Sequence, residues 1–271
     1  EGLVRGIFDA MIALKQDAAK QQTAKLMGDG YGLPADEAMS MFQDAHSTNW
    51  AENYQFFMNQ NNPTNFERIW NQAYYLYRQI GKVKHRKVPF DQVMDFSVIK
   101  KLGDEEKYAS QTDEYSVRFA PKANSELRVE SEILTNTVVI HFYPNSWDLY
   151  KKIIEKDGDK EIERLYDPRV DLVLERIAEL AGKFGTARVL IEGHTDSSMK
   201  GRAPESLVKE LSNNRANAVK QALIENFDTM DPNQFNAVGK GWDRPADPDN
   251  PLDHTKNRRV EIKILRAEAG A

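Results

Sequence analysis

The stretch VLIEGHTDSS, Val189 to Ser198, decides the fold of the second half of this chain. Its run of β-branched and leucine residues predicts a buried strand, and Gly193 predicts that the chain turns where the strand ends. Asp196 then lies just beyond the strand, where a loop meets the edge of a sheet. Because an ionisable residue at that position is usually presented to a partner or a ligand, Asp196 is a candidate binding residue.

Strand and helix patterns alternate on both sides of this stretch. Apolar runs predict strands at 137–144, 187–193, 234–241 and 258–265, and amphipathic patterns predict helices at 170–185 and 211–227. Such alternation indicates an α/β (α+β) fold in which the helices cover one face of a small sheet. We place this domain at residues 135–266, followed by a short tail at 267–271.

The first half of the chain has a different pattern. Residues 1–102 carry apolar side chains at helical spacing, and they predict an all-helical region. Within it, Thr64 or Asn65 is the candidate N-cap of a helix that ends at Gly81. Residues 103–134 are polar at first, and apolar and polar residues then alternate, so we expect a linker that contains one or two short edge strands.

Composition excludes several classes of protein. The chain has 271 residues, of which 40% are hydrophobic, and its formal net charge of −5 gives no electrostatic reason to expect nucleic acid as a partner. It has no cysteine, which excludes disulfides and thiolate metal sites. No stretch approaches eighteen apolar residues, so we expect no membrane span. The sequence starts at Glu1 without a signal-peptide pattern, so we expect a processed chain or a fragment.

Arg215 is the second candidate binding residue. We expect Ser212 to be the N-cap of the helix at 211–227, which places Arg215 in the first turn and on the apolar side. A cation there opposes the helix dipole, and a core-facing arginine needs a partner. Both features are explained if Arg215 and the helix N-terminus bind a carboxylate while Asp196 binds an ammonium group. An internal salt bridge between Asp196 and Arg215 is an equally good interpretation of these residues alone.

Four ordered motifs, IEGHTD, LSNNRANAV, GKG and NRRVEI, resemble the OmpA-like peptidoglycan-binding domain family over residues 135–266. The resemblance implies a βαβαββ sandwich that holds the diaminopimelate residue of the cell-wall stem peptide without catalysis. It assigns the amino and carboxyl groups of that residue to Asp196 and Arg215. Thr195, Asn257 and Arg258 are further candidates for ligand contact, and the alternative is a structural role, Thr195 in the turn and Asn257 and Arg258 in pairing the final strand with the loop below the pocket. Val208 stands where the family usually has asparagine, and the loop after Asp196 is longer than usual, so the rim of the pocket departs from the family pattern.

Residues 1–102 resemble the C-terminal part of periplasmic solute-binding proteins of the sulfonate, nitrate and thiamine-precursor type. The resemblance rests on the strings LVRGIFDAMIALKQDAAKQQTAKLMGDGYGLPADEAMSMF, NQNNPTNFERIWNQAYYLYRQIGKV and PFDQVMDFSVIKKL. It implies that the other lobe is missing from this chain, so we name no solute site. A membrane protein or transporter is a possible partner of this half.

The chemistry that the sequence offers is binding and not catalysis. The histidines lack ligand spacing, so we expect no metal, and no nucleophile with a nearby base or nucleotide loop is recognisable, so we expect no enzyme activity and no cofactor. The sequence therefore predicts a periplasmic protein anchored to peptidoglycan. The alternatives are a wall-tethered solute receptor of an ABC-type transport system and a scaffold or stator-type interaction protein.

Overall fold

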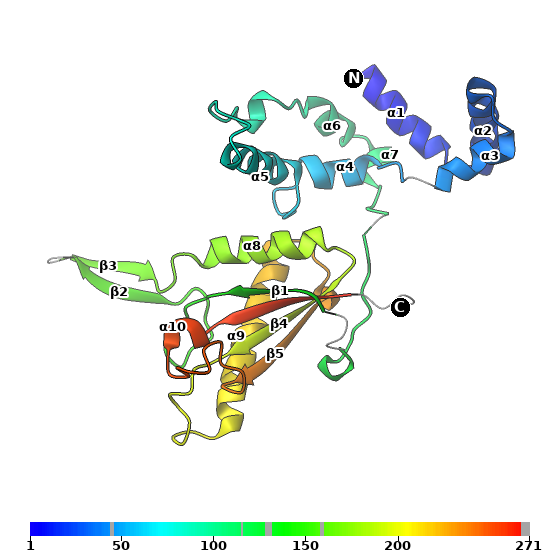
Figure 1. Ribbon diagram of the computed structural model, residues 1–271. Helices are drawn as coiled ribbons and strands as arrows, with labels where there is room; N and C mark the ends of the chain where they lie inside the picture. The colour runs from blue at the N-terminus through cyan, green and yellow to red at the C-terminus, as the bar shows by residue number, and fades with distance from the viewer. Residues whose placement is uncertain (44–45, 115, 128–131, 158–159, 267–271) are drawn as a thin grey trace. The chain divides into compact units, whose positions relative to one another are not determined.

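The computed structural model describes residues 1–43, 46–114, 116–127, 132–157 and 160–266. The chain divides into two compact units (Figure 1). The first consists of Glu1–Gln60 and Asn65–Ser116, and the second of Asn61–Thr64 and Val117–Ala271. The predicted tail at 267–271 lies outside the described residues, as do residues 128–131 of the predicted linker.

The regular elements of the first unit are all helices within its described residues, as the sequence predicts. Its helices are α1 (Gly2–Ala13), α2 (Asp17–Tyr31), α3 (Ala35–Ser40), α4 (Trp50–Phe57), α5 (Phe66–Gln79), α6 (Ser97–Leu102) and α7 (Glu106–Ala109), with 3₁₀ turns at Met41–Gln43 and Phe90–Gln92. Of the two candidate caps, Asn65 is the one that accepts a hydrogen bond from the backbone N–H of Arg68, at 2.9 Å, and so begins α5. Among the described helices of the whole chain, none is long and apolar enough to cross a membrane.

The second unit is built on a mixed sheet in the order β1-β6-β4-β5, in which only β4 and β5 run parallel. Its elements are β1 (Glu132–Val138), β2 (Lys152–Asp157), β3 (Lys160–Leu165), α8 (Val170–Lys183), β4 (Arg188–His194), α9 (Glu205–Asn226), β5 (Phe235–Gly241), α10 (His254–Asn257) and β6 (Val260–Leu265), with 3₁₀ turns at Asn124–Glu126 and Pro232–Gln234. This is the small mixed sheet with helices that the sequence predicts.

Alternation along the central strands decides which face the helices cover. Val189 and Ile191 of β4 belong to one buried apolar cluster together with Leu174 of α8 and Val219 of α9. Because these two strand residues point to the same side of the sheet, α8 and α9 pack on one face. The intervening residues of β4 face the other way, which leaves the charged Glu192 and the polar end of the strand on the opposite face.

Two glycines allow α9 to approach the sheet closely. A Cβ atom on Gly193 of β4 would lie 2.2 Å from the carbonyl oxygen of Ser212, and one on Gly239 of β5 would lie 2.2 Å from that of Lys209. Any larger residue would push the helix away. The glycines of the IEGHTD and GKG motifs therefore set the distance between α9 and the strands that carry the candidate site.

Several predicted element boundaries are wrong. The first predicted strand, 137–144, starts earlier and ends at Val138, because the backbone N–H of His141 donates to the carboxylate of Asp167 instead of to a neighbouring strand. The edge strands expected in the linker are not formed by residues 116–127; β1 itself starts at Glu132. The hairpin β2–β3, which pairs only with itself and extends beyond the sheet in Figure 1, was not predicted.

Candidate functional site

Asp196 lies two residues after β4 and is almost fully buried, with a side chain that is 2% exposed. Its Oδ1 accepts a hydrogen bond from the backbone N–H of Ser198 at 2.8 Å. Its Oδ2 is contacted by Nε of Arg258 and lies 3.4 Å from Nδ1 of His254. Burial raises the pKa of Asp196, but the hydrogen bonds from Ser198 and Arg258 and the charge of Arg258 together outweigh it, so the pKa lies below its usual value. Asp196 is therefore an anion at neutral pH.

Arg215 lies in the middle of α9, and the prediction that it occupies the first turn is wrong. The helix begins at Glu205 after Pro204, a full two turns before Ser212, so Ser212 is not the N-cap. Its hydroxyl instead accepts a hydrogen bond from the N–H of Gly241, at 3.0 Å. The helix N-terminus consequently contributes nothing to a carboxylate site at Arg215, and the guanidinium is the cation that remains.

The guanidinium of Arg215 is held by neutral groups. Its Nε donates to the carbonyl oxygen of Ser146 at 3.0 Å and its Nη2 to that of Tyr143 at 3.5 Å, while its central carbon lies 5.0 Å from the ring centroid of Phe142. Burial and the charge of Arg258 lower its pKa to about 10, so it stays charged at neutral pH. Among the described residues no carboxylate lies within 4.0 Å of it, so Asp196 and Arg215 do not form the internal salt bridge that the sequence left open.

A pocket of about 200 Å³ lies between these elements. Arg215 lines it, and so do Arg258 and His254, the two residues that contact Asp196. Asp196 itself is not among the lining residues that the structure describes. The remaining lining is partly apolar and partly cationic: Ile140, His141, Phe142, Tyr166, Gly193, His194, Arg259 and Val260. The pocket thus offers a buried cation and, beneath Arg258, a buried anion.

The structure places the other predicted site residues at different depths. Asn257 is fully buried and ties down the loop before α10, because its Oδ1 accepts from the N–H of Asp247 at 3.2 Å and its Nδ2 donates to the carbonyl of Asn250 at 3.0 Å. Thr195 donates its backbone N–H to Gly241 at 2.8 Å. Its hydroxyl is buried and forms no hydrogen bond among the described residues. Arg258 is half-exposed and pairs with Asp196.

Sequence reasoning missed His254, Phe142 and Tyr166. His254 precedes Asn257 by three residues, one helical turn, and the short helix α10 brings both to the same side of the loop. That spacing in DHTKNRR was a usable signal. Phe142 and Tyr166 come from segments on either side of the unpredicted hairpin, and nothing local in the sequence places them beside α9.

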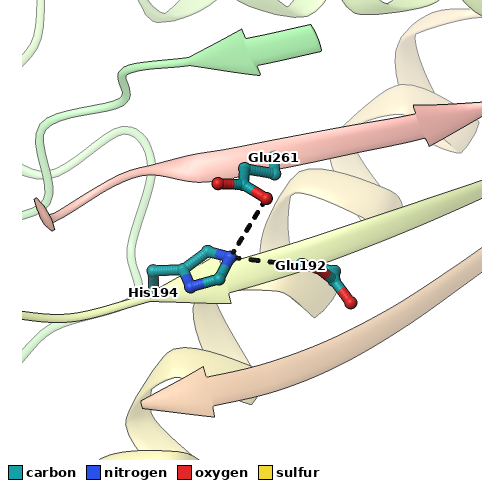
Figure 2. A group of neighbouring side chains, drawn as sticks. All are labelled: Glu192, His194 and Glu261. Atoms are coloured by element: carbon teal, nitrogen blue, oxygen red, sulfur yellow. Dashed lines mark ion pairs between the residues drawn. The ribbon is translucent and has the colours of Figure 1, made fainter. Parts of the chain in front are cut away.

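A second polar cluster lies next to the pocket on β4 and β6 (Figure 2). Nε2 of His194 is 4.0 Å from Oε2 of Glu192 and 3.7 Å from Oε2 of Glu261, distances short enough for the three side chains to hold a metal ion. Each carboxylate, however, already has cationic partners.

Glu192 lies 3.1 Å from Nζ of Lys240 and 3.2 Å from Nζ of Lys263, and Glu261 accepts from Nε of Arg259 at 2.7 Å. Three cations therefore balance two carboxylates, and a divalent ion would add repulsion. Burial and the charge of Arg259 lower the pKa of His194 to about 4, which keeps it neutral. We assign this cluster a structural role: Glu261 fixes Arg259, which lines the pocket, whereas the two ring nitrogens of His194 are buried without a hydrogen-bond partner among the described residues.

Comparison with known proteins supports an OmpA-like domain in this half of the chain. Residues 160–259 match the OmpA family. Outer membrane protein Omp38 from two strains of Acinetobacter baumannii is 35% identical over 100 residues, which are 36% of this chain and 26% of the relative. The chain thus spans about a quarter of the length of these curated relatives. The matched residues include Thr195, Asp196, Arg215, Asn257 and Arg258, and no more than part of the predicted domain at 135–266.

Solved structures with similarity to this chain include proteins of the bacterial envelope. An outer membrane protein from Borrelia burgdorferi B31 is 29% identical, covers 49% of this chain and 88% of its own, and has a TM-score of 0.33. The peptidoglycan-associated lipoprotein from Burkholderia pseudomallei is 25% identical, with coverages of 45% and 96% and a TM-score of 0.30. The periplasmic domain of Helicobacter pylori MotB is 26% identical, with coverages of 44% and 85% and a TM-score of 0.32.

Proposed function

We propose that the second unit binds cell-wall peptidoglycan without catalysis and so anchors a periplasmic protein to the wall. The ligand group is the zwitterionic end of the diaminopimelate residue of the stem peptide. Its carboxylate pairs with Arg215 and its ammonium with Asp196. One observation carries the proposal: Arg215 is a buried, charged guanidinium that lines a pocket and has no carboxylate partner among the described residues.

The state of Arg215 supports a carboxylate ligand. An unpaired buried charge costs several kcal/mol relative to water, on the order of 3–5 kcal/mol when a partner is removed. Carbonyl oxygens of Ser146 and Tyr143 and the ring of Phe142 compensate part of this and fix the plane of the guanidinium. An incoming carboxylate then meets oriented donors, which favours a charge-assisted hydrogen bond.

Asp196 receives the ammonium by exchanging partners. Its Oδ1 stays on the N–H of Ser198, so the carboxylate keeps its orientation, while Oδ2 exchanges the guanidinium of Arg258 for the ligand ammonium. Arg258 is half-exposed and can turn toward the ligand or solvent. Thr195 offers a buried hydroxyl close by, and Asn257 acts indirectly by holding the loop that carries His254.

Two charge-assisted contacts, at roughly 1.5–3 kcal/mol each, predict weak affinity for a free stem peptide, on the order of millimolar to tens of micromolar. A wall polymer that repeats the same group many times converts this weak affinity into retention through local concentration. Anchoring by the second unit leaves the first unit to meet other partners. Its resemblance to a solute-binding protein, and with it a transporter partner, stays a prediction from the sequence.

Sedimentation with purified sacculi tests the proposal. We expect the full chain to co-sediment and Asp196→Ala or Arg215→Ala to remain in the supernatant with an unchanged circular dichroism spectrum. Arg164→Ala is a matched control, because Arg164 lies on the exposed hairpin and its ion pair within the described part of the chain is with Glu155. If both site variants sediment like the parent chain, the assignment of the site is wrong.

A further inference from the structure

A second hollow lies beside the pocket, on the outer side of α9. It has a volume of about 350 Å³ and is lined by Trp147, Asn214, Asn217, Ala218, Lys220 and Gln221. Asn214, Asn217, Ala218 and Gln221 recur at helical spacing and form one face of α9. Trp147 comes from the segment that leads into β2 and supplies the wall opposite the helix.

The hollow and the pocket are built from the same two segments. Arg215, which faces the pocket, follows Asn214, which faces the hollow. Ser146, whose carbonyl accepts a hydrogen bond from Arg215, precedes Trp147. The bond between Arg215 and Ser146 therefore joins the two sites, which lie on neighbouring residues of both segments.

Trp147 presents an aromatic face to solvent. Its side chain is 52% exposed, and the indole N–H forms no hydrogen bond among the described residues. An exposed indole offers a flat apolar surface together with one donor. Such a surface suits a ligand ring that has C–H bonds on its face and polar groups at its edge.

The polar side chains of the hollow are amides with unused hydrogen-bonding capacity. The amide of Asn214 forms no hydrogen bond among the described residues, and Nδ2 of Asn217 donates to the carbonyl of Asn213 at 2.9 Å, which leaves its Oδ1 as an acceptor. The cation of Lys220 is engaged with the carbonyl of Phe235 at 2.7 Å. The lining contains no carboxylate. The hollow thus favours a neutral ligand rich in hydroxyl and amide groups.

We propose that this hollow binds an N-acetylated hexosamine of the glycan strand, with the sugar ring stacked on Trp147 and its hydroxyl and acetamido groups on Asn214 and Asn217. The inference rests on the proposed function, because the strand reaches α9 only if its stem peptide occupies the neighbouring pocket. A peptide or protein ligand would gain less here, since the hollow has neither an apolar anchor pocket nor a charge to pair.

Calorimetry on the full chain separates the two sites. The probes are a β-1,4-linked N-acetylglucosamine oligosaccharide for the hollow and free diaminopimelate for the pocket. We expect Trp147→Ala to weaken oligosaccharide binding about five- to tenfold and to leave the affinity for diaminopimelate unchanged. Trp147→Phe should lose about half as much oligosaccharide binding energy as Trp147→Ala, since a smaller ring still stacks on the sugar.

Leu172→Ala is the matched control, because Leu172 on α8 is a large apolar side chain that is 58% exposed. It should bind both probes like the parent chain. Asp196→Asn, which leaves the hydrogen bond between Arg215 and Ser146 in place, should lose diaminopimelate and keep the oligosaccharide. If the parent chain binds diaminopimelate but no oligosaccharide, or if Trp147→Ala binds the oligosaccharide as tightly as the parent, the glycan subsite is overturned while the proposed function stands. Oligosaccharide binding without diaminopimelate binding would overturn the proposed function, and with it the assignment of the hollow to the glycan strand.

Discussion

Nε of Arg258 contacts Oδ2 of Asp196, whereas Arg215, on the other side of the pocket, has no carboxylate partner among the described residues. The two arginines are close enough for the charge of Arg258 to lower the pKa of Arg215. One cation thus shields the buried anion and the other is left for a ligand. The carboxylate site that we propose requires this asymmetry, because a closed salt bridge between Asp196 and Arg215 would leave no cation for a ligand.

Arg215→Lys should lose most binding to sacculi, about tenfold or more, although the charge is retained. A lysine cannot form two parallel hydrogen bonds to one carboxylate. Its ammonium group is also not planar, so it cannot stack on Phe142 as the guanidinium does while it is hydrogen-bonded to the carbonyl of Ser146. The dissociation constant from a sedimentation titration measures the effect. Arg164→Lys on the hairpin serves for comparison, and equal affinity of the two lysine variants would argue against a bidentate carboxylate site.

Asp196→Asn should abolish binding of free diaminopimelate while the domain stays folded. The amide oxygen can still accept from the N–H of Ser198, but the charge that attracts an ammonium group is gone. Asp247→Asn removes a charge from a more exposed ion pair with Lys256 and should bind normally. Calorimetry gives both affinities, and retention of tight binding by Asp196→Asn would show that the ammonium binds elsewhere.

His194 should make the second unit less stable as the pH falls from 6.5 toward 4. Its pKa is lowered to about 4 in the folded state, so below the unfolded value of 6.5 the unfolded chain binds the extra proton. Stability is therefore complete above pH 6.5 and decreases by about 1.4 kcal/mol per pH unit below it. Glu192 and Asp196, whose pKa values are also lowered, lose their contributions only below their unfolded values of 4.5 and 3.8.

Native-state hydrogen exchange in β4 and β6 at pH 6.5 and 5.0 measures this decrease. In His194→Gln the free energy of unfolding should change little between pH 6.5 and 5.0, even if the variant is less stable than the parent chain at pH 6.5. Leu172→Ala changes an exposed residue of the same unit that has no titratable group, and its stability should decrease with pH like that of the parent chain. An unchanged slope in His194→Gln would mean that another group binds the proton.

Gly193→Ala should destabilise the second unit by about 1–3 kcal/mol, because the new Cβ meets the carbonyl oxygen of Ser212 in the backbone of α9. Gly185→Ala is the control: its Cβ would lie 3.4 Å from the nearest atom, the carbonyl oxygen of Gly182. Urea denaturation gives the free energy of unfolding for each variant. Equal stability would show that α9 can move away from the sheet without cost.

Asn257→Ala should lower the stability of the loop before α10 by about 1–3 kcal/mol, because the N–H of Asp247 and the carbonyl of Asn250 lose their partner. Lys256→Ala, which breaks only an exposed ion pair with Asp247, should change little. Hydrogen exchange at residues 247–253 reports the difference. If Asn257→Ala instead weakens diaminopimelate binding while residues 247–253 stay as protected from hydrogen exchange as in the parent chain, Asn257 contacts the ligand directly.

The sequence alone determined the α+β class of the second unit, the helical character of the first, and the two charged residues proposed here as anchors. These follow from local information: the spacing of apolar residues, the glycines after strands and the charged residues that break an apolar pattern. The start of α9 was misjudged, because Ser212 looks like a cap, although its hydroxyl is used by β5 far along the chain.

Only the tertiary structure decided which charges pair. Asp196 and Arg258 are 62 residues apart, and Arg215 meets the carbonyl of Ser146 across 69 residues. Such contacts depend on how α9 and the last strand pack against β4, which no local pattern records. The same holds for Trp147, which becomes one wall of a hollow only because the chain before β2 runs along α9. Local sequence thus fixes the kinds of element and the chemistry that each carries, whereas packing fixes which of those groups face a common space.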